Sequence, residues 1–461
     1  MAIDQFYPED HIEKEIEDSP ISTRNIQFTS ALGQNSYKRY NIHFLEDDVI
    51  IYVASNRYQT FNLTTHEYKT YAGTDTDGIG SIAVHPNRKY FAVAEKGDKP
   101  AIYIREYPSM RLYRVMRKGT EKMYVHTEFS ATGEKLVSLG GAPDYTLTVW
   151  NWLNQRVILK CKASSQEVFR ASFSPYLDMV LCTSGQGHVK FWQMAQTFTG
   201  LKLQGDGGKF GQIDLSDVSS FYELPDGKML SGTEQGTLIL WEGVLVKAHL
   251  VLEKETKAPV HKGMIEVILY EDKHFITAGA DGYIKWWPLA DIDGAEGDDC
   301  QEVAIRPTKE VSISTPEGEF AHIIHMIKGK GMWLIQDAKG RLWQLDAKDY
   351  QATVIREFQS GAITDIALSD TFNMAITTGE DGLVKVWDYL REKPLYQVKY
   401  EGRAECIDIL RRSDVNKGRI CVVGYSTGVV RVLGLGETKL EMANVFKAHD
   451  TAVVKVKYCP A

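Results

Sequence analysis

The stretch Ile363–Asp388 reads ITDIALSDTFNMAITTGEDGLVKVWD. It contains two short runs of apolar and β-branched residues, Met374–Thr378 and Leu383–Trp387, which are separated by the sequence GEDG. An Asp-Gly pair between two such runs is typical of a β-hairpin, because the tight turn needs a positive φ angle that Gly adopts without a Cβ clash. The second run ends in Trp387-Asp388. The stretch therefore predicts two antiparallel strands that end at a Trp-Asp mark.

The same arrangement recurs along the chain. A Trp closes an apolar run in four further units, at intervals of roughly 40 to 50 residues, at Trp150, Trp192, Trp241 and Trp287. In three units a Gly stands at one fixed distance before the Trp, at Gly236, Gly282 and Gly382. Another unit keeps the turn glycine, Gly340, but has Leu345-Asp346 at the expected place of the mark. This period and offset are typical of β-propeller blades, and the units resemble WD40 repeats.

The repeats predict an all-β fold with more blades than one ring usually holds. Nine units are followed by one further expected strand, 453–458, whereas propeller rings commonly hold four to eight blades. We therefore expect an acidic N-terminal tail (residues 1–20), a first WD40 propeller (21–352) and the opening blades of a second, incomplete propeller (353–461). A single nine-bladed ring is the alternative.

Composition excludes several classes of function. A net charge of −8 argues against nucleic acid as the main partner and against broad binding to an acidic membrane or a microtubule lattice. Only a local basic patch could support binding to either surface. The six cysteines form no CxxC pair, which favours a reducing compartment without a zinc framework. The acidic N-terminus has no apolar segment of the kind found in signal peptides. We expect a soluble intracellular protein without a membrane partner.

One unit carries the residue types of a buried hydrogen-bond network. A buried His, hydroxyl, Asp and indole N–H at this spacing can satisfy one another, as buried polar groups must. The rival interpretation is a catalytic or metal-binding His–Asp pair, and we favour the structural one. The predicted tetrad is His261, Thr277, Asp281 and Trp287. The unit of the opening stretch keeps Thr377, Asp381 and Trp387 but has Ser360-Gly361 where Gly-His is expected, which predicts an incomplete network.

The sequence contains one motif that resembles an enzyme site. Residues 424–428 read GYSTG and match GxSxG, the nucleophile elbow of α/β-hydrolases, with Ser426 as the nucleophile. An elbow requires a strand that turns into a helix, but the run after Gly428 has the pattern of another strand. We therefore expect a non-enzymatic protein with no catalytic residue, no cofactor and no bound metal.

Surface features offer candidates for partner binding. Two long connections, 194–215 and 289–305, either carry binding specificity or are solvated insertions. The most basic run, 105–122, is expected on the outermost strand of the second blade. Its charges either guard an edge strand against aggregation or form a patch for an acidic partner such as a tubulin surface. The candidate patch is Arg111, Arg114, Arg117, Lys118 and Lys122.

Residues 210–247 carry a more specific resemblance, FGQIDLSDVSSFYELPDGKMLSGTEQGTLILWEGVLVK. This segment is similar to a family of cilia- and flagella-associated proteins. The resemblance implies an axonemal protein with tandem propellers and a long coiled coil, which takes part in the tether of an inner-arm dynein at the doublet microtubule. It implies inner-arm dynein and other tether subunits as partners, and tubulin as a further candidate. No sustained heptad pattern occurs in this chain. A general cytosolic WD40 adaptor is the alternative.

Overall fold

The structure is a computed structural model that describes residues 31–54, 56–74, 77–198, 200–296, 302–391, 393–410 and 419–459. The acidic tail expected at residues 1–20 lies outside this part. The described residues form nine sheets, each built almost entirely from strands that follow one another in the chain. The first three sheets are β1 (Ile42–Phe44), β2 (Val49–Ala54), β3 (Arg57–Asn62) and β4 (Tyr68–Ala72); β5 (Ile79–Val84), β6 (Tyr90–Glu95), β7 (Ile102–Glu106) and β8 (Leu112–Met116); and β9 (Tyr124–Phe129), β10 (Leu136–Gly140), β11 (Thr146–Asn151) and β12 (Arg156–Lys162).

The remaining sheets follow the same plan, with one parallel addition. The fourth and fifth are β13 (Val168–Phe173), β14 (Val180–Gly185), β15 (His188–Thr197) and β16 (Gly200–Gly207); and β17 (Ser220–Glu223), β18 (Met229–Gly232), β19 (Leu238–Glu242) and β20 (Leu245–Val251), to which β24 (Glu302–Ala304) adds in parallel. The sixth and seventh are β21 (Ile265–Glu271), β22 (His274–Gly279), β23 (Tyr283–Pro288) and β25 (Lys309–Ser312); and β26 (Ile323–Lys328), β27 (Met332–Asp337), β28 (Arg341–Asp346) and β29 (Ala352–Glu357). The last two are β30 (Ile363–Leu368), β31 (Met374–Gly379), β32 (Leu383–Asp388) and β33 (Lys393–Lys399); and β34 (Ala404–Ile409), β35 (Ile420–Tyr425), β36 (Val429–Leu435) and β37 (Leu440–Lys447).

The hairpin that the opening stretch predicts is the β31–β32 pair. These strands pair antiparallel with Thr377 opposite Lys385. Gly382 in their turn has a φ of +79°, and Gly236 and Gly282 at the same place in two other sheets have +86° and +77°. A side chain is strained in this left-handed region, so the fixed Gly in the repeat reflects one turn geometry that recurs from sheet to sheet.

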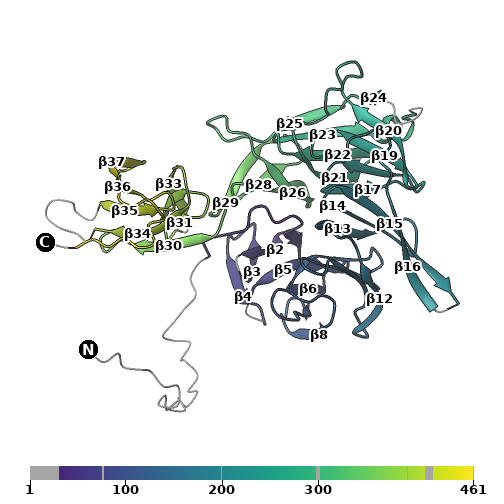
Figure 1. Ribbon diagram of the computed structural model, residues 1–461, viewed down its shortest axis with the longest axis horizontal. Coiled ribbons are helices and arrows are strands. Elements are labelled where there is room, and N and C mark those ends of the chain that lie inside the picture. Colours follow the sequence, from purple (N-terminus) through teal and green to yellow (C-terminus); the bar gives the residue numbers. More distant parts are fainter. Residues whose placement is uncertain are drawn as a thin grey trace, which may run out of the picture. The chain divides into compact units, whose positions relative to one another are not determined.

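Seven hydrophobic clusters join the first seven sheets into a closed ring. Each cluster lies between two sheets that are consecutive in the chain, except for one that joins the first sheet to the seventh. In that cluster Ile42 and Tyr52 pack with Leu334 and Phe358. Figure 1 shows the same closure, with purple β2 beside green β26 and β28. Ring closure covers every sheet face with a neighbour, which a row of separate blades cannot do.

The eighth and ninth sheets share a hydrophobic cluster of their own, which includes Ile376, Val384, Val423 and Leu433. The strand expected at 453–458 does not form. That segment makes no ladder with β34, although Val453 is buried against Cys406 and the Cys406 thiol lies 3.2 Å from the carbonyl oxygen of Val453. Side-chain packing therefore takes the place of backbone pairing there.

Both long connections contain regular secondary structure. In the first, 194–197 belongs to β15 and 200–207 forms β16, whose glycine-rich end pairs with β15 up to Gly207 opposite Lys190. The second contains the short helix α1 (Leu289–Asp293) and β24, while 297–301 lies outside the described residues. In the described part of the chain, no helix has the length and apolar character needed to span a membrane.

Candidate functional site

The tetrad residues of the sixth sheet lie in one hydrogen-bonded chain. The indole Nε1 of Trp287 donates to Thr277 Oγ1 at 2.8 Å, and the same hydroxyl lies 2.7 Å from Nε2 of His261. The other ring nitrogen of His261 lies 2.9 Å from a carboxylate oxygen of Asp281. Trp287 and Thr277 are fully buried and His261 is almost so, which leaves a substrate no access to this His–Asp pair. The geometry favours a structural role for all four residues.

The eighth sheet, where an incomplete network is expected, satisfies its Trp and Asp with other residues, in two separate pieces rather than one chain. Trp387 donates to Thr377 Oγ1 at 2.8 Å, and that hydroxyl donates to the side-chain oxygen of Gln359. Ser360 then donates to Asp381 at 2.7 Å. Gln359 and Ser360 thus divide the two contacts that one His makes in the sixth sheet. The spacing of the sixth sheet places a His at position 361, and Gln359, two residues earlier, could not be recognised from that spacing.

In the seventh sheet Leu345 lies opposite Trp333, in the register that Trp287 and Trp387 have in their own sheets, and the indole stands two residues earlier. Trp343, not Leu345, is the buried indole, and its Nε1 donates to Asp337 Oδ2 at 2.9 Å. Arg341 Nε donates to the same oxygen at 2.7 Å. The backbone N–H groups of Lys339 and Arg341 both donate to Oδ1 at 2.9 Å. Asp337 is therefore a fully buried carboxylate with four donors, which the sequence analysis did not identify.

The remaining Trp marks are also buried and hydrogen-bonded to hydroxyls of the neighbouring strand. Their acceptors lie 2.8 to 2.9 Å away, namely Ser138 for Trp150, Thr183 for Trp192 and Ser231 for Trp241. Asp388 instead accepts two backbone N–H bonds in the turn that follows β32. These residues hold blades together and offer no chemistry to a substrate.

The GxSxG sequence lies in a β-hairpin. Gly424 and Tyr425 end β35, and β36 begins at Val429 directly after Gly428. The Ser426 hydroxyl accepts the backbone N–H of Arg403 at 3.0 Å. A strand–turn–strand geometry lacks the helix that an elbow needs, so the motif gives no support to a hydrolase.

A segment before the first sheet fills the central channel of the ring. We call residues 34–41 the channel segment. Lys38 Nζ donates to the carbonyl of Gly80 at the start of β5, and the guanidinium of Arg39 lies 4.8 Å from the ring centroid of Phe169 in β13. Asn41 accepts the backbone N–H of Val53 at 3.0 Å. The segment enters the channel at Ser36. The hydroxyl of Ser36 donates to the carbonyls of Ala338 and Ser360, at 2.7 and 2.8 Å.

Arg39 and Tyr40 make the deepest contacts of the channel segment. Arg39 forms a two-pronged ion pair with Glu266 of β21, at 2.7 and 3.1 Å. The Tyr40 hydroxyl donates to the carbonyl of Ser219 at 3.0 Å, and its ring meets those of His126 and His325 edge-on at 5.1 and 5.3 Å. Together with the contacts above, the segment reaches all seven sheets of the ring. Sequence periodicity could not reveal this role, because residues 34–41 lie outside the repeat.

Two histidines around Tyr40 make the ring sensitive to acid. Burial lowers the pKa of His43 to about 4, and burial with the nearby charge of His43 lowers that of His325 to about 3. An unfolded His titrates near 6.5, so at acidic pH the unfolded chain binds protons that the folded ring does not. The contribution of these two histidines to the stability of the ring is fully present above about pH 6.5. It is lost as pH falls toward their pKa values in the folded ring. At about pH 5 each of these histidines is expected to lower the free energy of unfolding by about 2 kcal/mol relative to neutral pH.

Urea unfolding at neutral and at acidic pH measures this effect. We expect His43→Gln with His325→Gln to lose less stability on acidification than the parent chain. His449→Gln, at an exposed position, should behave like the parent. Equal acid sensitivity of the double variant and the parent would contradict the assignment.

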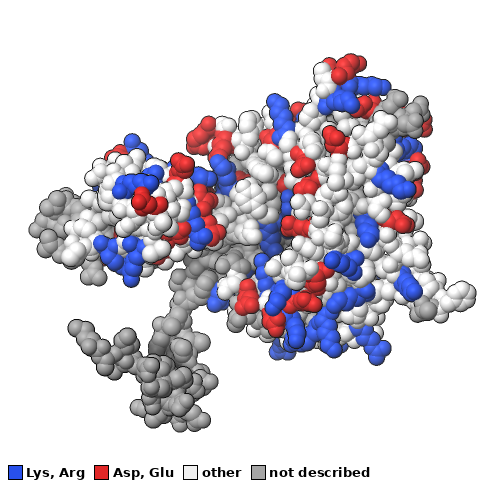
Figure 2. Space-filling view, viewed as in Figure 1, with Lys and Arg blue, Asp and Glu red and all other residues white. Residues whose placement is uncertain are grey.

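A basic surface runs along the outer strands of the second and third sheets. Lys160 Nζ donates to the carbonyl of Lys118 at 2.7 Å, and Arg114 Nε to that of Leu153 at 2.9 Å, so β8 and β12 lie side by side. No acidic residue occurs in 107–120 or 152–163. Figure 2 shows Lys and Arg side chains gathered where Figure 1 places these strands. We call this surface the basic strip; it comprises Arg111, Arg114, Arg117, Lys118, Arg156, Lys160 and Lys162.

The structure changes the membership of the candidate patch. Arg111, Arg117 and Lys118 are exposed, whereas Arg114 is half-buried with its guanidinium 4.0 Å from the ring centroid of Tyr113. Lys122 lies past the end of β8 and forms a 2.9 Å ion pair with Asp98, so its charge is already balanced. Within the described ranges, none of the seven members of the basic strip forms an ion pair with an acid. The β12 residues belong to another repeat, and only the fold brings them to β8.

Comparisons with known proteins agree with this fold. Residues 69–295 match a family model described as the first β-propeller of echinoderm microtubule-associated protein. Residues 352–388, which include most of the eighth sheet, match a model described as WD domain, G-beta repeat. Both models describe propeller blades, and the nine sheets have the architecture of such blades.

Several known proteins are similar to this chain over nearly its full sequence. Cilia- and flagella-associated protein 44 of Mus musculus is 39% identical over 449 residues, which cover 93% of this chain and 24% of the relative. The protein of that name from Chlamydomonas reinhardtii is 34% identical over 447 residues, covering 93% and 25%. Echinoderm microtubule-associated protein-like elp-1 of Caenorhabditis elegans is 21% identical over 456 residues, covering 92% and 48%. The chain spans about a quarter of the length of the first two.

Proposed function

Because this chain is a WD40-repeat β-propeller protein that resembles cilia- and flagella-associated protein 44, we propose that it is an axonemal scaffold of cilia and flagella. Its role is to dock a tether complex that positions and regulates an inner-arm dynein on the doublet microtubule. The proposed partners are inner-arm dynein and other tether subunits. The observation that carries the proposal is the similarity over 93% of the chain to relatives named for cilia and flagella.

The domain arrangement that suits this role is a closed first propeller followed by the opening blades of a second. The first ring is held by seven continuous clusters and by the channel segment, so it presents its surfaces at fixed spacing. A scaffold under load needs such fixed spacing between partners. Its buried polar networks serve cohesion, which accords with a protein that binds rather than catalyses.

The basic strip is the surface that we propose meets an acidic partner. Six of its seven side chains are exposed, and their charge contrasts with the net −8 of the chain. Opposite charge steers association and fixes orientation, and exposed Leu112 and Val157 on the same strands add apolar contact area. The matching family model is named for microtubule association, which supports an acidic tubulin surface as the partner of this strip.

Retention on extracted axonemes tests the axonemal role. We expect the tagged chain to stay with axonemes from a ciliated cell after detergent and high-salt extraction. A general cytosolic adaptor would leave with the soluble fraction. Recovery of the chain in that fraction, at normal expression, would overturn the axonemal proposal and favour the adaptor.

Charge reversal on the basic strip tests the tubulin surface. We expect Lys118→Glu with Lys160→Glu and Lys162→Glu to weaken co-sedimentation with microtubules by about tenfold, since three attractive pairs become repulsive. The matched control is Lys89→Glu with Lys202→Glu and Lys254→Glu, which changes net charge equally at exposed lysines off the strip. Equal losses in both triple variants would show a general charge effect and contradict a specific site.

A further inference from the structure

A cavity of about 420 Å³ lies in the propeller channel, between the sixth and seventh sheets. Its walls are the second halves of β21 and β26, from Val267 to Glu271 and from His325 to Lys328, together with Trp333 at the start of β27. We call it the turn-side cavity, because these strand ends lead into the β21–β22 and β26–β27 turns. Tyr40, Arg170 and Tyr222 complete it from within the channel.

The cavity is closed on one side by the channel segment. Arg39 pairs with Glu266, the second residue of β21, and Tyr40 contacts His325, the third residue of β26. The cavity begins at that level and continues to Lys328, the last residue of β26. Three residues of an extended strand span about 10 Å. The cavity is therefore a blind pocket that opens at the turns, on the side opposite to the entry of the channel segment.

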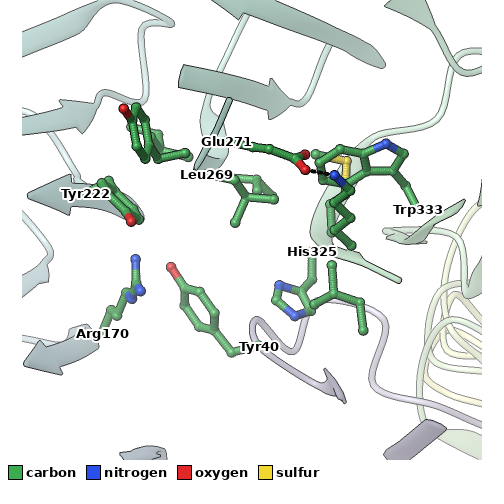
Figure 3. Close-up of a pocket in the computed structure, with 13 residues that line it drawn as sticks. Tyr40, Arg170, Tyr222, Leu269, Glu271, His325 and Trp333 are labelled. Atoms are coloured by element: carbon green, nitrogen blue, oxygen red, sulfur yellow. Dashed lines mark ion pairs between the residues drawn. The ribbon is translucent and has the colours of Figure 1, made fainter. Parts of the chain in front are cut away.

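The inner end of the cavity is polar and strained. Tyr40 has a φ of +53°, an uncommon conformation for a residue with a large side chain. Arg170 donates from Nη1 to the carbonyl of Phe221 at 2.7 Å and lies 3.6 Å from Glu128 through Nη2. Its buried Nε has no hydrogen-bond partner among the described residues. Figure 3 shows the Tyr40 and Tyr222 hydroxyls and the Arg170 guanidinium pointing toward one another.

The walls and the mouth have different chemistry. Leu269 projects into the middle of the cavity, and Val267, Ile327 and Trp333 add apolar surface around it. At the mouth, Glu271 and Lys328 form an ion pair, and both side chains are partly exposed. Pockets that bind ligands commonly combine such apolar walls with a few polar groups that fix orientation.

We propose that the turn-side cavity binds a short peptide segment of a partner protein in which an apolar or aromatic side chain stands beside a carboxylate. The side chain fills the space around Leu269 and Trp333. The carboxylate meets the guanidinium of Arg170, whose Nη2 is ion-paired with Glu128 at 3.6 Å but whose buried Nε has no hydrogen-bond partner among the described residues. A peptide suits the mouth because its backbone N–H and C=O groups find an acceptor in Glu271 and a donor in Lys328. This site is separate from the basic strip and adds a second partner surface to the scaffold.

Selection from a random short-peptide phage library on the parent chain, with counter-selection on Leu269→Trp, tests the proposal. We expect enriched peptides that carry Asp or Glu next to a large apolar residue. Synthetic versions should bind the parent in fluorescence anisotropy and lose about tenfold or more in affinity for Leu269→Trp and for Arg170→Lys. The matched control, Leu245→Trp at an exposed position of β20, should bind like the parent.

Several outcomes overturn the proposal. They are a selection without enrichment, peptides that bind Leu269→Trp as tightly as the parent, and peptides without a preference for a carboxylate. Urea unfolding of each variant shows whether it is folded, and Ile327→Trp replaces Leu269→Trp if that variant is not. The triple charge reversal on the basic strip should leave peptide binding unchanged, so the two surfaces succeed or fail separately.

Discussion

Replacing Arg39 with Met is expected to lower the free energy of unfolding of the ring by about 3 kcal/mol. Glu266 is only 3% exposed, and its partner donates to both carboxylate oxygens. Removal of Arg39 leaves a buried charge with a distant contact to His322 at 3.8 Å as its remaining ion pair within the described residues. Equilibrium urea unfolding, followed by tryptophan fluorescence, measures the loss.

Two further variants separate the buried pair from a general loss of an arginine. Arg88→Met removes an exposed pair with Asp47 and should cost less than about 1 kcal/mol. Arg39→Met with Glu266→Gln should recover part of the loss, because the stranded charge is gone. If Arg39→Met and Arg88→Met unfold at the same urea concentration, the channel segment does not hold the ring as described.

Replacing Asp337 with Ala is expected to cost about 4 kcal/mol, because four donors lose one acceptor together. Among them, the Arg341 side chain is only 9% exposed, and it keeps Glu319 at 3.3 Å as its remaining ion pair in the described part of the chain. The buried indole of Trp343 loses its 2.9 Å bond. Thermal and urea unfolding give the size of the effect. A loss of this size would make the seventh sheet depend on Asp337 as the sixth depends on its tetrad.

The matched control for Asp337 is Asp346, an exposed aspartate at the end of β28, the next strand of the same sheet. It also accepts backbone N–H bonds, from Lys348 at 2.7 Å and Asp349 at 3.3 Å, but it pairs with no buried side chain. Asp346→Ala should cost no more than about 1 kcal/mol. Comparable losses at Asp337 and Asp346 would contradict the buried network.

The sequence predicted what its repeats encode. The period, the turn glycine and the terminal Trp are each needed by one blade geometry, so they recur and can be recognised without a structure. The sixth-sheet tetrad followed from the same logic, since each member satisfies another. Where the residue type changes, recognition failed, as with Gln359 in the eighth sheet and Trp343 in the seventh.

Features that depend on ring closure could not be predicted in this way. The channel segment contacts residues 300 or more positions away, such as Gln336 and Ser360, and its own sequence has no repeat. The basic strip joins β8 to β12, and the turn-side cavity joins β21, β26 and Tyr40. Each lies between blades, whereas periodicity describes one blade at a time.

Proximity labelling in a ciliated cell, with the enzyme fused to this chain and its neighbours identified by mass spectrometry, tests the scaffold role most directly. We expect inner-arm dynein chains and tubulin among the strongest signals, above those of a labelling enzyme targeted to the cilium by itself. A neighbourhood of soluble cytosolic proteins without dynein would contradict the axonemal account and leave the propeller without an assigned place.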